Sequence, residues 1–389
     1  MTMELPAIAR IAAALVAALL ISFIATPVVK SIAQMVGAVD VPKDNRRMHN
    51  HPIPRMGGLA IFLGFLLSTL IFVPMSSSMR GMLLGGVIIV ILGIFDDIYA
   101  LPALPKLLVQ IAAALVAVLH GNVIQVLSNP NIFSENPYWT LGSLAVPLSV
   151  IWIVAITNAV NLIDGLDGLA VGVATISSLT MLVIAMLVSE NVVALMMAAL
   201  AGGCIGFMPY NLNPAKIFMG DTGSTFLGFV LATVSIQGLF KFYTIISFAV
   251  PFLMLGLPLF DTCFAILRRL AKGQSPMAPD RSHVHHRLID MGFNQKQAVA
   301  ILYVISAILG LSAVVLTTSG ALKAMVLLCA LCLAGLISGK IFLSHNENHQ
   351  EKTKEKESND HAIESHDDLR DPPGGGEDGP SGKGTGEQN

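Results

Sequence analysis

The sequence predicts an all-α integral membrane protein, a polytopic bundle of about eleven transmembrane helices with the N-terminus outside and the C-terminus inside. Of the 389 residues, 54% are apolar and only 12% are charged, and the mean hydropathy is +0.72. A soluble domain carries about twice that charged fraction. The apolar residues fall in runs approaching the ~20 residues that cross a bilayer. Basic residues gather between alternate runs, which predicts the orientation.

The predicted spans follow one another along the chain. The first, 8–28, is too long for a cleaved signal peptide, and its basic residues follow it instead of preceding it. Ten further apolar runs, bounded by polar or turn residues, lie at 57–75, 81–95, 104–120, 142–158, 168–188, 191–209, 223–238, 243–267, 297–316 and 320–343. The sixth and seventh are separated only at 189–191, which makes the number eleven instead of ten.

Two segments carry further structural signals. The ninth run contains Pro251 and Pro258 with Gly256 between them. Proline removes a helical hydrogen bond, so this run is expected to be kinked. The connection 121–141 has strand-like character at 123–127 and is expected to form a small hairpin.

The charges divide the chain into a multi-span domain, 1–344, and a tail, 345–389. The first holds 18 Lys and Arg against 13 Asp and Glu, and the tail holds 5 against 12. Gly, Pro and charge in the tail cannot bury enough surface to order it, so disorder is expected there. This distribution excludes a nucleic-acid partner bound by bulk positive charge. The cysteines exclude a secreted disulfide scaffold. All four lie in apolar runs, where cysteine serves as a small packing residue: Cys204, Cys263, Cys329 and Cys332.

The basic residues predict which loops face the cytoplasm. The loops after runs one, three, seven and nine hold thirteen Lys and Arg, whereas the opposite loops offer Arg80 and Lys241. By the positive-inside rule the basic loops are cytoplasmic, and eleven spans that start outside place the acidic tail inside.

Most of the chemically useful side chains fall in loops on that same side. They are Asp96 and Asp97; Asn158, Asn161, Asp164 and Asp167; Asn211, Lys216 and Asp221; His49, His51 and Arg55; and Asp280, Arg281, His283, His285, His286 and Arg287. A conduction path would distribute polar groups through the depth of the membrane. The asymmetry therefore predicts one site at one membrane face.

Several of these clusters suit a phosphoryl-transfer site. Adjacent carboxylates such as Asp96 and Asp97 repel each other unless a cation is near, although they could merely cap a helix. Acids and amides in 158–169 offer the oxygen ligands that Mg²⁺ prefers, with simple turn chemistry as the alternative. The turn 220–224 opens a predicted helix, whose free N–H groups could hold a phosphate, or it could be only a turn.

The remaining signals concern the substrate. The three histidines are interpreted as cationic donors to a diphosphate in preference to a transition-metal site. Phe218 is either a stacking platform for a base or packing at the membrane interface. Together the signals predict magnesium-assisted phosphoryl transfer at the cytoplasmic interface, with a lipid phosphate as one substrate.

Five segments in order resemble the polyprenyl-phosphate N-acetylhexosamine-1-phosphate transferases, glycosyltransferase family 4. They are 49–58 (HNHPIPRMGG), 95–97 (FDD), 158–169 (NAVNLIDGLDGL), 214–224 (PAKIFMGDTGS) and 280–288 (DRSHVHHRL). The resemblance covers roughly residues 35–300 and does not extend to the tail. The histidine segment is similar to the branch that uses UDP-N-acetylglucosamine. The phospho-N-acetylmuramoyl-pentapeptide branch tends to have three consecutive histidines after a proline, a pattern that Val284 interrupts.

The resemblance implies transfer of N-acetylglucosamine 1-phosphate from UDP-N-acetylglucosamine to undecaprenyl phosphate, giving undecaprenyl-diphosphate-N-acetylglucosamine and UMP. It implies Mg²⁺ or Mn²⁺ as cofactor and a multi-pass protein of the bacterial cell membrane. The product would start wall teichoic acid or other envelope polysaccharides. Homodimer formation is left open. The nearest alternative is the phospho-N-acetylmuramoyl-pentapeptide transferase of peptidoglycan synthesis, and a transporter and a catalytically inactive scaffold are alternatives of other classes.

The resemblance also implies residue roles. Asp221 would bind the metal with Asn161 as second oxygen ligand, and Asp96 and Asp97 would deprotonate or orient the lipid phosphate. Further residues would bind the nucleotide sugar: some would contact its sugar and base, and others would bind its diphosphate. These residues are Asp164 and Asp167 for the sugar nucleotide, Phe218 and Asn211 for uridine, and Lys106, Arg281, His283, His285 and His286 for the diphosphate. Direct attack and a covalent aspartyl intermediate both stay open. The kinked ninth run would open a groove for the polyprenyl chain.

Overall fold

A computed structural model describes residues 5–41, 51–128, 138–238, 246–271, 273 and 283–317 of the protein, with the backbone alone for 128, 138 and 246–249. The chain divides into two units, Met1–Ile337 and Ser338–Asn389, and every described residue belongs to the first. The predicted eleventh span, the acidic tail, His49, Asp280 and Arg281 lie outside the described residues.

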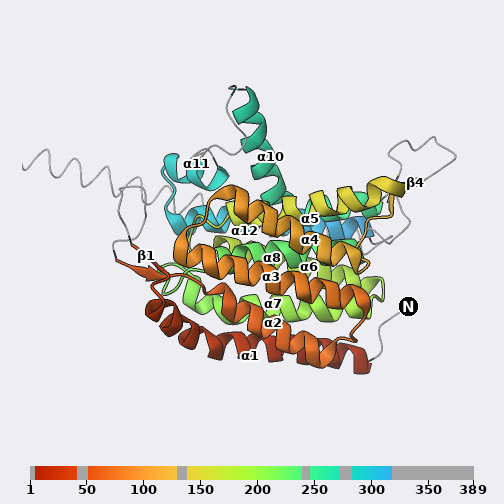
Figure 1. Ribbon diagram of the computed structural model, residues 1–389, viewed down its shortest axis with the longest axis horizontal. Helices are drawn as coiled ribbons and strands as arrows, with labels where there is room; N and C mark the ends of the chain where they lie inside the picture. The colour runs from red at the N-terminus through yellow and green to blue at the C-terminus, as the bar shows by residue number, and fades with distance from the viewer. Residues whose placement is uncertain are drawn as a thin grey trace, which may run out of the picture. The chain divides into compact units, whose positions relative to one another are not determined.

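The described chain is almost entirely α-helical (Figure 1). Its helices are α1 (Leu5–Met35), α2 (Gly58–Phe72), α3 (Ser77–Tyr99), α4 (Ala103–Leu119), α5 (Ala145–Leu162), α6 (Leu169–Leu187), α7 (Asn191–Asn211), α8 (Gly220–Gly238), α9 (Ile246–Met254), α10 (Gly256–Ala271), α11 (Val284–Asp290) and α12 (Gln295–Thr317). A 3₁₀ turn at Gly142–Leu144 leads into α5. Within the described residues, the first ten predicted runs fall mainly on helices. The predicted break between runs six and seven is confirmed by the end of α6 and the start of α7.

Six helical segments among the described residues are long and apolar enough to cross a bilayer, which confirms an all-α membrane protein. They are Leu5–Met35, Ser77–Tyr99, Gly142–Leu162, Leu169–Leu187, Asn191–Asn211 and Gln295–Thr317. Two shorter apolar helices, Gly58–Phe72 and Ala103–Leu119, accompany them. The total of eleven spans and the orientation stay predictions.

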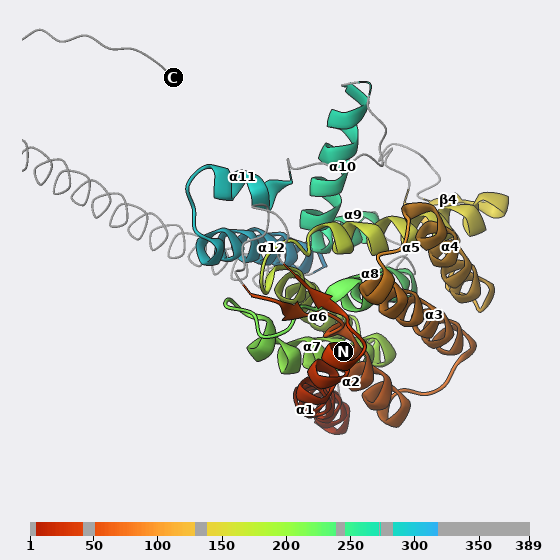
Figure 2. The ribbon, with the colours of Figure 1, turned by 60° about the vertical axis from the view of Figure 1, so that its left-hand side comes forward.

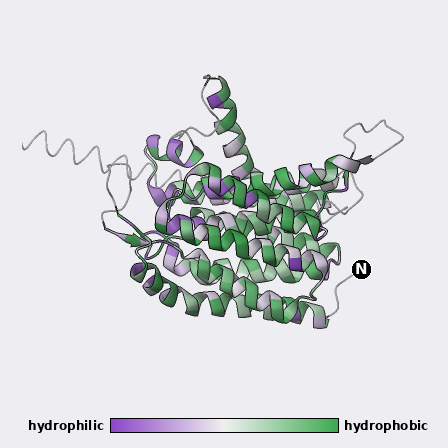
Figure 3. Cartoon of the chain, in the orientation of Figure 1, coloured by the Kyte–Doolittle hydropathy of each residue, from purple (hydrophilic) through white to green (hydrophobic). Residues whose placement is uncertain are grey.

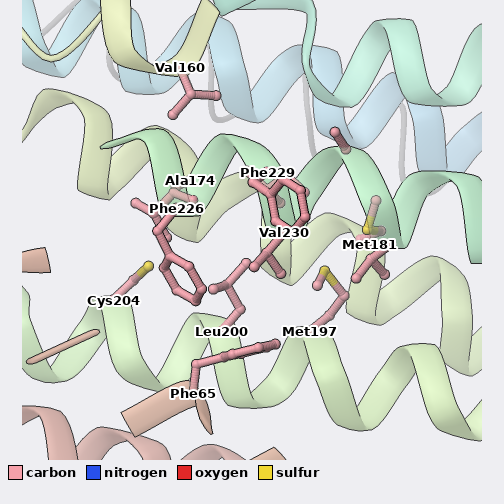
Figure 4. Packing of buried hydrophobic residues seen from close by; sticks show 14 of the residues in the cluster. Phe65, Val160, Ala174, Met181, Met197, Leu200, Cys204, Phe226, Phe229 and Val230 are labelled. Atoms are coloured by element: carbon pink, nitrogen blue, oxygen red, sulfur yellow. The ribbon is translucent and has the colours of Figure 1, made fainter. Parts of the chain in front are cut away.

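Helix α8 forms the centre of the bundle and is buried along nearly its whole length. Phe226 packs edge-on against Phe65 of α2, and Met181 of α6 and Met197 of α7 belong to the same core (Figure 4). The ring of Phe229 lies against Gly85 of α3. Cys204 belongs to this core, as predicted for a packing residue, whereas Cys263 is exposed. Helix α2 can approach α8 closely because Gly58 has no side chain. A Cβ at that position would collide with the backbone of Gly223. This close approach brings the first loop to the start of α8.

The predicted kink and the predicted hairpin are both present. The ninth run is broken at Leu255 into α9 and α10, and α10 projects away from the bundle (Figure 2). In the connection 121–141, β3 (Val126–Ser128) pairs antiparallel with β4 (Tyr138–Thr140), so the hairpin begins slightly later than the predicted 123–127. A second short pair, β1 (Val39–Asp40) with β2 (Ile53–Pro54), lies at the other end of the bundle and was not predicted.

Hydrophilic residues gather at the end of the bundle where β1 lies, while the helix walls are largely hydrophobic (Figure 3). At this end α3, α5 and α7 finish and α4, α6 and α8 begin. The helix termini therefore bring together segments that are far apart in the sequence.

Candidate active site

Lys106 joins two carboxylates at the polar end of the bundle. Helix α3 carries Asp96 in its last turn and ends at Tyr99, with Ala100 in the left-handed region. Helix α4 begins at Ala103. Asp96 Oδ1 accepts the Leu101 N–H at 2.7 Å, and its Oδ2 accepts from Lys106 Nζ at 2.7 Å. The same ammonium lies 3.3 Å from Asp221 Oδ2. A positive charge between two acids offsets the repulsion that would otherwise push them apart.

Asp97 serves the start of α8 and does not point at Lys106. Its carboxylate accepts the Asp221 N–H at 2.9 Å, the Thr222 N–H at 3.1 Å and the Thr222 hydroxyl at 2.6 Å. The first N–H groups of a helix have no partner within the helix, and a carboxylate there also meets the positive end of the helix dipole. Asp97 thus occupies two of the N–H groups at this turn, which favours the turn-only alternative, and phosphate binding by the turn stays a prediction.

Arg55 adds a second positive charge beside these carboxylates, and no role for it was predicted from the sequence. Its Nε lies 3.4 Å from Asp97 Oδ1, and 31% of its side chain is exposed. Its charge also acts on Asp164 and Asp221. The available signal was its place in a basic loop beside two glycines. Alone, that signal did not separate it from neighbouring basic residues.

The loop between α5 and α6 presents two acids with different surroundings. Burial, followed by the charges of Asp221 and Asp97, raises the pKa of Asp164 to about 8. Asp167 Oδ2 instead accepts from Asn213 Nδ2 and from the Ala215 N–H, both at 3.0 Å. Asp164 therefore faces the acid cluster, while Asp167 holds the loop that precedes α8.

That preceding loop, 212–219, is fixed from both sides. Asn211 is buried, and its Nδ2 donates to the Ile217 carbonyl at 3.0 Å. Phe218 N–H donates to the Pro54 carbonyl, and the Gly57 and Gly58 N–H groups donate to the carbonyls of Phe218 and Met219, at 2.8–2.9 Å. The ring of Phe218 is half-buried. Asn211 thus shapes the loop that carries Phe218, and uridine binding by either residue stays a prediction.

The histidines lie against the Asp164 loop. His283 and His285 stack with ring centroids 5.8 Å apart, and His286 is 4.3 Å from His285. A Cβ on Gly165 would collide with the His285 ring, so only glycine permits this contact. Burial, and then the charge of His286, lowers the pKa of His285 to about 4. His285 is therefore neutral near pH 7, which differs from the predicted cationic donor.

Asn161 and Asp221 are chemically suited to Mg²⁺. Among the described residues no three His, Cys, Asp or Glu side chains converge into a metal cage. Mg²⁺ does not need one, since it ordinarily takes one or two protein carboxylates and completes its shell with phosphates and water. The Asn161 side chain makes no hydrogen bond to another described residue, and Asp221 is half-buried beside Lys106. An amide oxygen and a carboxylate are thus available.

The structure brings together all five motif segments within its described part. Loop 54–58 pairs with 218–219, Asp97 binds the start of α8, Asp167 binds 213–215, and His285 packs on Gly165. Two further contacts were not predicted. Tyr303 of α12 donates its hydroxyl to the Gly168 carbonyl, and Asp261 of α10 binds His283. Neither residue lies in a recognisable motif, so only the fold reveals them.

Comparison with known proteins agrees with this arrangement. The family model described as glycosyl transferase family 4 matches residues 79–239. A Bacillus subtilis protein named as a probable undecaprenyl-phosphate N-acetylglucosaminyl 1-phosphate transferase is 43% identical over 80% of this chain and 86% of its own length. The decaprenyl-phosphate N-acetylglucosaminephosphotransferase of Mycobacterium tuberculosis is 35% identical over 74% and 77%.

A third relative belongs to the other branch considered above. The phospho-N-acetylmuramoyl-pentapeptide-transferase of Staphylococcus aureus is 29% identical over 76% of this chain and 95% of its own. The family match covers the helices that carry Asp96, Lys106 and Asp221 and the loop that carries Asp164. With these similarities, the chain belongs to glycosyl transferase family 4.

Proposed function

We propose that this protein transfers N-acetylglucosamine 1-phosphate from UDP-N-acetylglucosamine to undecaprenyl phosphate, releasing UMP. The relatives named above as N-acetylglucosaminyl 1-phosphate transferases support the donor sugar and the polyprenyl acceptor. The observation that carries the proposal is the convergence of Asp96, Lys106 and Asp221 at the polar end of an apolar bundle. A site there can meet a lipid phosphate and a water-soluble nucleotide at once.

In the proposed reaction an oxygen of the lipid phosphate forms a bond to the phosphorus that bears the sugar. The bond from that phosphorus to the oxygen bridging to the uridine phosphate breaks, and UMP leaves with the electron pair. Lys106 offsets negative charge on the phosphoryl oxygens, and Asp96 orients the lipid phosphate or takes its proton. Direct attack and an aspartyl intermediate give the same products.

Asp221 and Asn161 are proposed to hold Mg²⁺, or Mn²⁺ in its place. A divalent ion bound there would neutralise phosphate charge during transfer. Asp164, Phe218 and Asn211 are proposed for the nucleotide sugar. Lys106, His283, His285, His286 and Arg281 are proposed for its diphosphate. Asp97 was predicted to act on the lipid phosphate and Asp167 to contact the nucleotide sugar. Both are proposed instead to position these groups, because Asp97 binds the start of α8 and Asp167 binds the loop before it.

We further propose eleven spans with the N-terminus outside, which places the site on the cytoplasmic face of a bacterial cell membrane. The basic loops support that orientation. UDP-sugars are cytoplasmic, so the donor would reach the site directly. The product is proposed to start teichoic acid or another envelope polysaccharide.

The test is UMP release by the purified protein in detergent with undecaprenyl phosphate and UDP-N-acetylglucosamine, with and without Mg²⁺. We expect UMP and the lipid diphosphate sugar in equal amounts, both dependent on the ion. Parallel reactions with UDP-N-acetylmuramoyl-pentapeptide decide between branches of the family. Turnover of that donor alone would replace the proposal, and flux of solute across proteoliposomes without UMP would indicate a transporter.

A further inference from the structure

Asp261 is a buried acid that the proposed reaction does not use. It lies on α10, is 4% exposed, and is six residues after Leu255, where α9 and α10 are separated. A buried carboxylate is costly unless it is paired and hydrogen-bonded. Its partners therefore indicate what it does.

Both oxygens of Asp261 are directed at the start of the histidine helix. Oδ2 lies 3.0 Å from His283 Nδ1, and Oδ1 accepts the Val284 N–H at 2.9 Å. An ionised carboxylate only accepts hydrogen bonds, so Nδ1 of His283 must carry the hydrogen. The hydrogen bond made by one ring nitrogen fixes the state of the other. Asp261 thereby leaves Nε2 as the nitrogen of His283 that has no protein partner among the described residues.

The effect reaches the acid cluster through two further contacts. The His283 ring is nearly parallel to that of His285, with an interplanar angle of 6°. His285 in turn packs on Gly165, beside Asp164. An unbroken series of contacts thus runs from Asp261 through two imidazoles to the loop between α5 and α6.

We propose that Asp261 is a positioning residue for the diphosphate of the nucleotide sugar, acting through His283. It holds one orientation of that imidazole, which leaves Nε2 of the doubly protonated ring to donate to a phosphate oxygen, and so fixes the histidine stack against the Asp164 loop. The inference rests on the proposed function. It also gives the buried acid of α10 a role other than carrying a proton or an ion through the membrane.

The test uses four variants of the full-length protein: Asp261→Asn, His283→Gln, the two combined, and Asp290→Asn as matched control. Asp290 is an exposed carboxylate on α11, so its replacement removes the same charge from the same region. UMP release is measured against each substrate in turn. At metal sites, removing the partner that orients a ligating histidine lowers metal affinity or activity about ten- to a hundred-fold, and we expect the lower end of that range for an orienting partner here.

We expect Asp261→Asn to lower kcat/KM for UDP-N-acetylglucosamine about tenfold, with the KM for undecaprenyl phosphate unchanged. The double variant should be no worse than His283→Gln, because both act on one group. Asp290→Asn should stay within about twofold of the wild type, as is usual for surface substitutions.

Three outcomes would overturn the inference: full activity of His283→Gln, losses that multiply in the double variant, or an equal rise in the KM of both substrates. If Asp261→Asn does not fold, His283→Gln still decides, and Asp261→Glu, which keeps the charge, should retain more activity than Asp261→Ala. An inactive wild type would instead contradict the proposed function, so the two failures are distinguishable.

Discussion

Asp97 and Asp221 are neighbours in space but experience opposite surroundings. Asp97 receives hydrogen bonds from Asp221 N–H and from two groups of Thr222, so its charge is compensated by the helix it binds. Asp221 instead accepts from the partly exposed ammonium of Lys106, which it shares with Asp96. The same substitution in each should therefore have different consequences for stability.

Asp221→Asn and Asp97→Asn should each abolish UMP release while the protein still inserts into the membrane. Only Asp97→Asn should also lower the thermal midpoint of the detergent-solubilised protein, by several degrees. An asparagine offers one acceptor oxygen in place of two, which leaves a buried donor without a partner at a cost of about 1–3 kcal/mol. Differential scanning fluorimetry beside the UMP assay measures both effects. Near-normal turnover of Asp221→Asn would remove it from the metal site.

His285 gives the protein a pH-dependent stability with a definite sign. Its pKa falls from an ordinary 6.5 to about 4 in the fold because the ring is buried and lies beside His286 and His283, and the charge of Asp261 opposes this fall. The unfolded chain therefore binds more protons between these pH values, so stability is lost as pH falls from 6.5 towards 4. The free energy of unfolding falls by about 3 kcal/mol in total once the pH is below both pKa values.

We expect the stability difference between the wild type and His285→Gln to narrow over that range. Thermal midpoints of both proteins, measured from pH 7.5 to pH 4.5, test this. Other carboxylates titrate there too, so only the difference between the two proteins is informative. A constant difference would show that His285 is charged or exposed in the folded protein.

At the scale of helices, the position of α2 depends on a glycine contact. Gly58→Ala would place a methyl group against the backbone of Gly223, which cannot move aside as a side chain can. Overpacking of this kind costs about 1–3 kcal/mol. The variant should therefore unfold at lower temperature and lose UMP release, since loop 54–58 would be displaced from 218–219.

Gly86→Ala on α3 is the matched control. A Cβ there would meet the ring of Phe226 at 3.5 Å, an ordinary contact, and alanine favours the helix more than glycine does. We expect its thermal midpoint to be unchanged or raised. Equal damage from both variants would mean that helix contacts in general, and not the Gly58–Gly223 approach, control the fold.

Most helices could be predicted because lipid imposes length and apolarity on each of them separately. The kink at Pro251 and Pro258 was predictable for the same local reason. What could not be predicted is which helix is central, because α8 reads as one apolar run among others and its burial follows from packing partners. The β1–β2 pair was missed since two-residue strands leave no periodic signal.

The site shows the same division. Residue types predicted that Asp96, Asp164 and Asp221 share one place, and their convergence is confirmed. Their partners were not predictable, because a hydrogen bond between Asp97 and the amides of α8 joins positions more than a hundred residues apart. The sequence indicated a free helix terminus where the fold supplies a carboxylate. The contacts of Asp261 with His283 and of Tyr303 with Gly168 also join distant positions, so the sequence did not predict them.

At the scale of the whole molecule, the acidic tail is expected to be dispensable for chemistry. Every contact described in the site comes from residues before 318. Deleting 345–389 should leave UMP release within about twofold of the full-length protein, because it removes none of the site residues. A collapse of turnover in the truncated protein, at equal membrane insertion, would show that the tail takes part in catalysis or binding.

The orientation is testable with single cysteines in a cysteine-free background. His51 is exposed at the polar end of the bundle and Thr140 is exposed on the hairpin. If the basic loops are cytoplasmic, an impermeant maleimide should label Thr140→Cys in intact cells and His51→Cys only in inside-out vesicles. The reverse pattern would move the site to the outer face and exclude a cytoplasmic nucleotide donor.

Segments 54–58 and 218–219 are joined by three N–H to carbonyl hydrogen bonds between main-chain atoms. Alanine scanning deletes side chains and leaves every one of those bonds in place. Such a survey would therefore score both segments as tolerant, apart from Arg55 and Phe218 themselves and from Gly57 and Gly58, where an added methyl group would collide with its neighbours. Only changes in the polypeptide backbone would disrupt these three hydrogen bonds. An amide-to-ester replacement at Phe218, or a proline in its place, would remove the N–H that donates to Pro54.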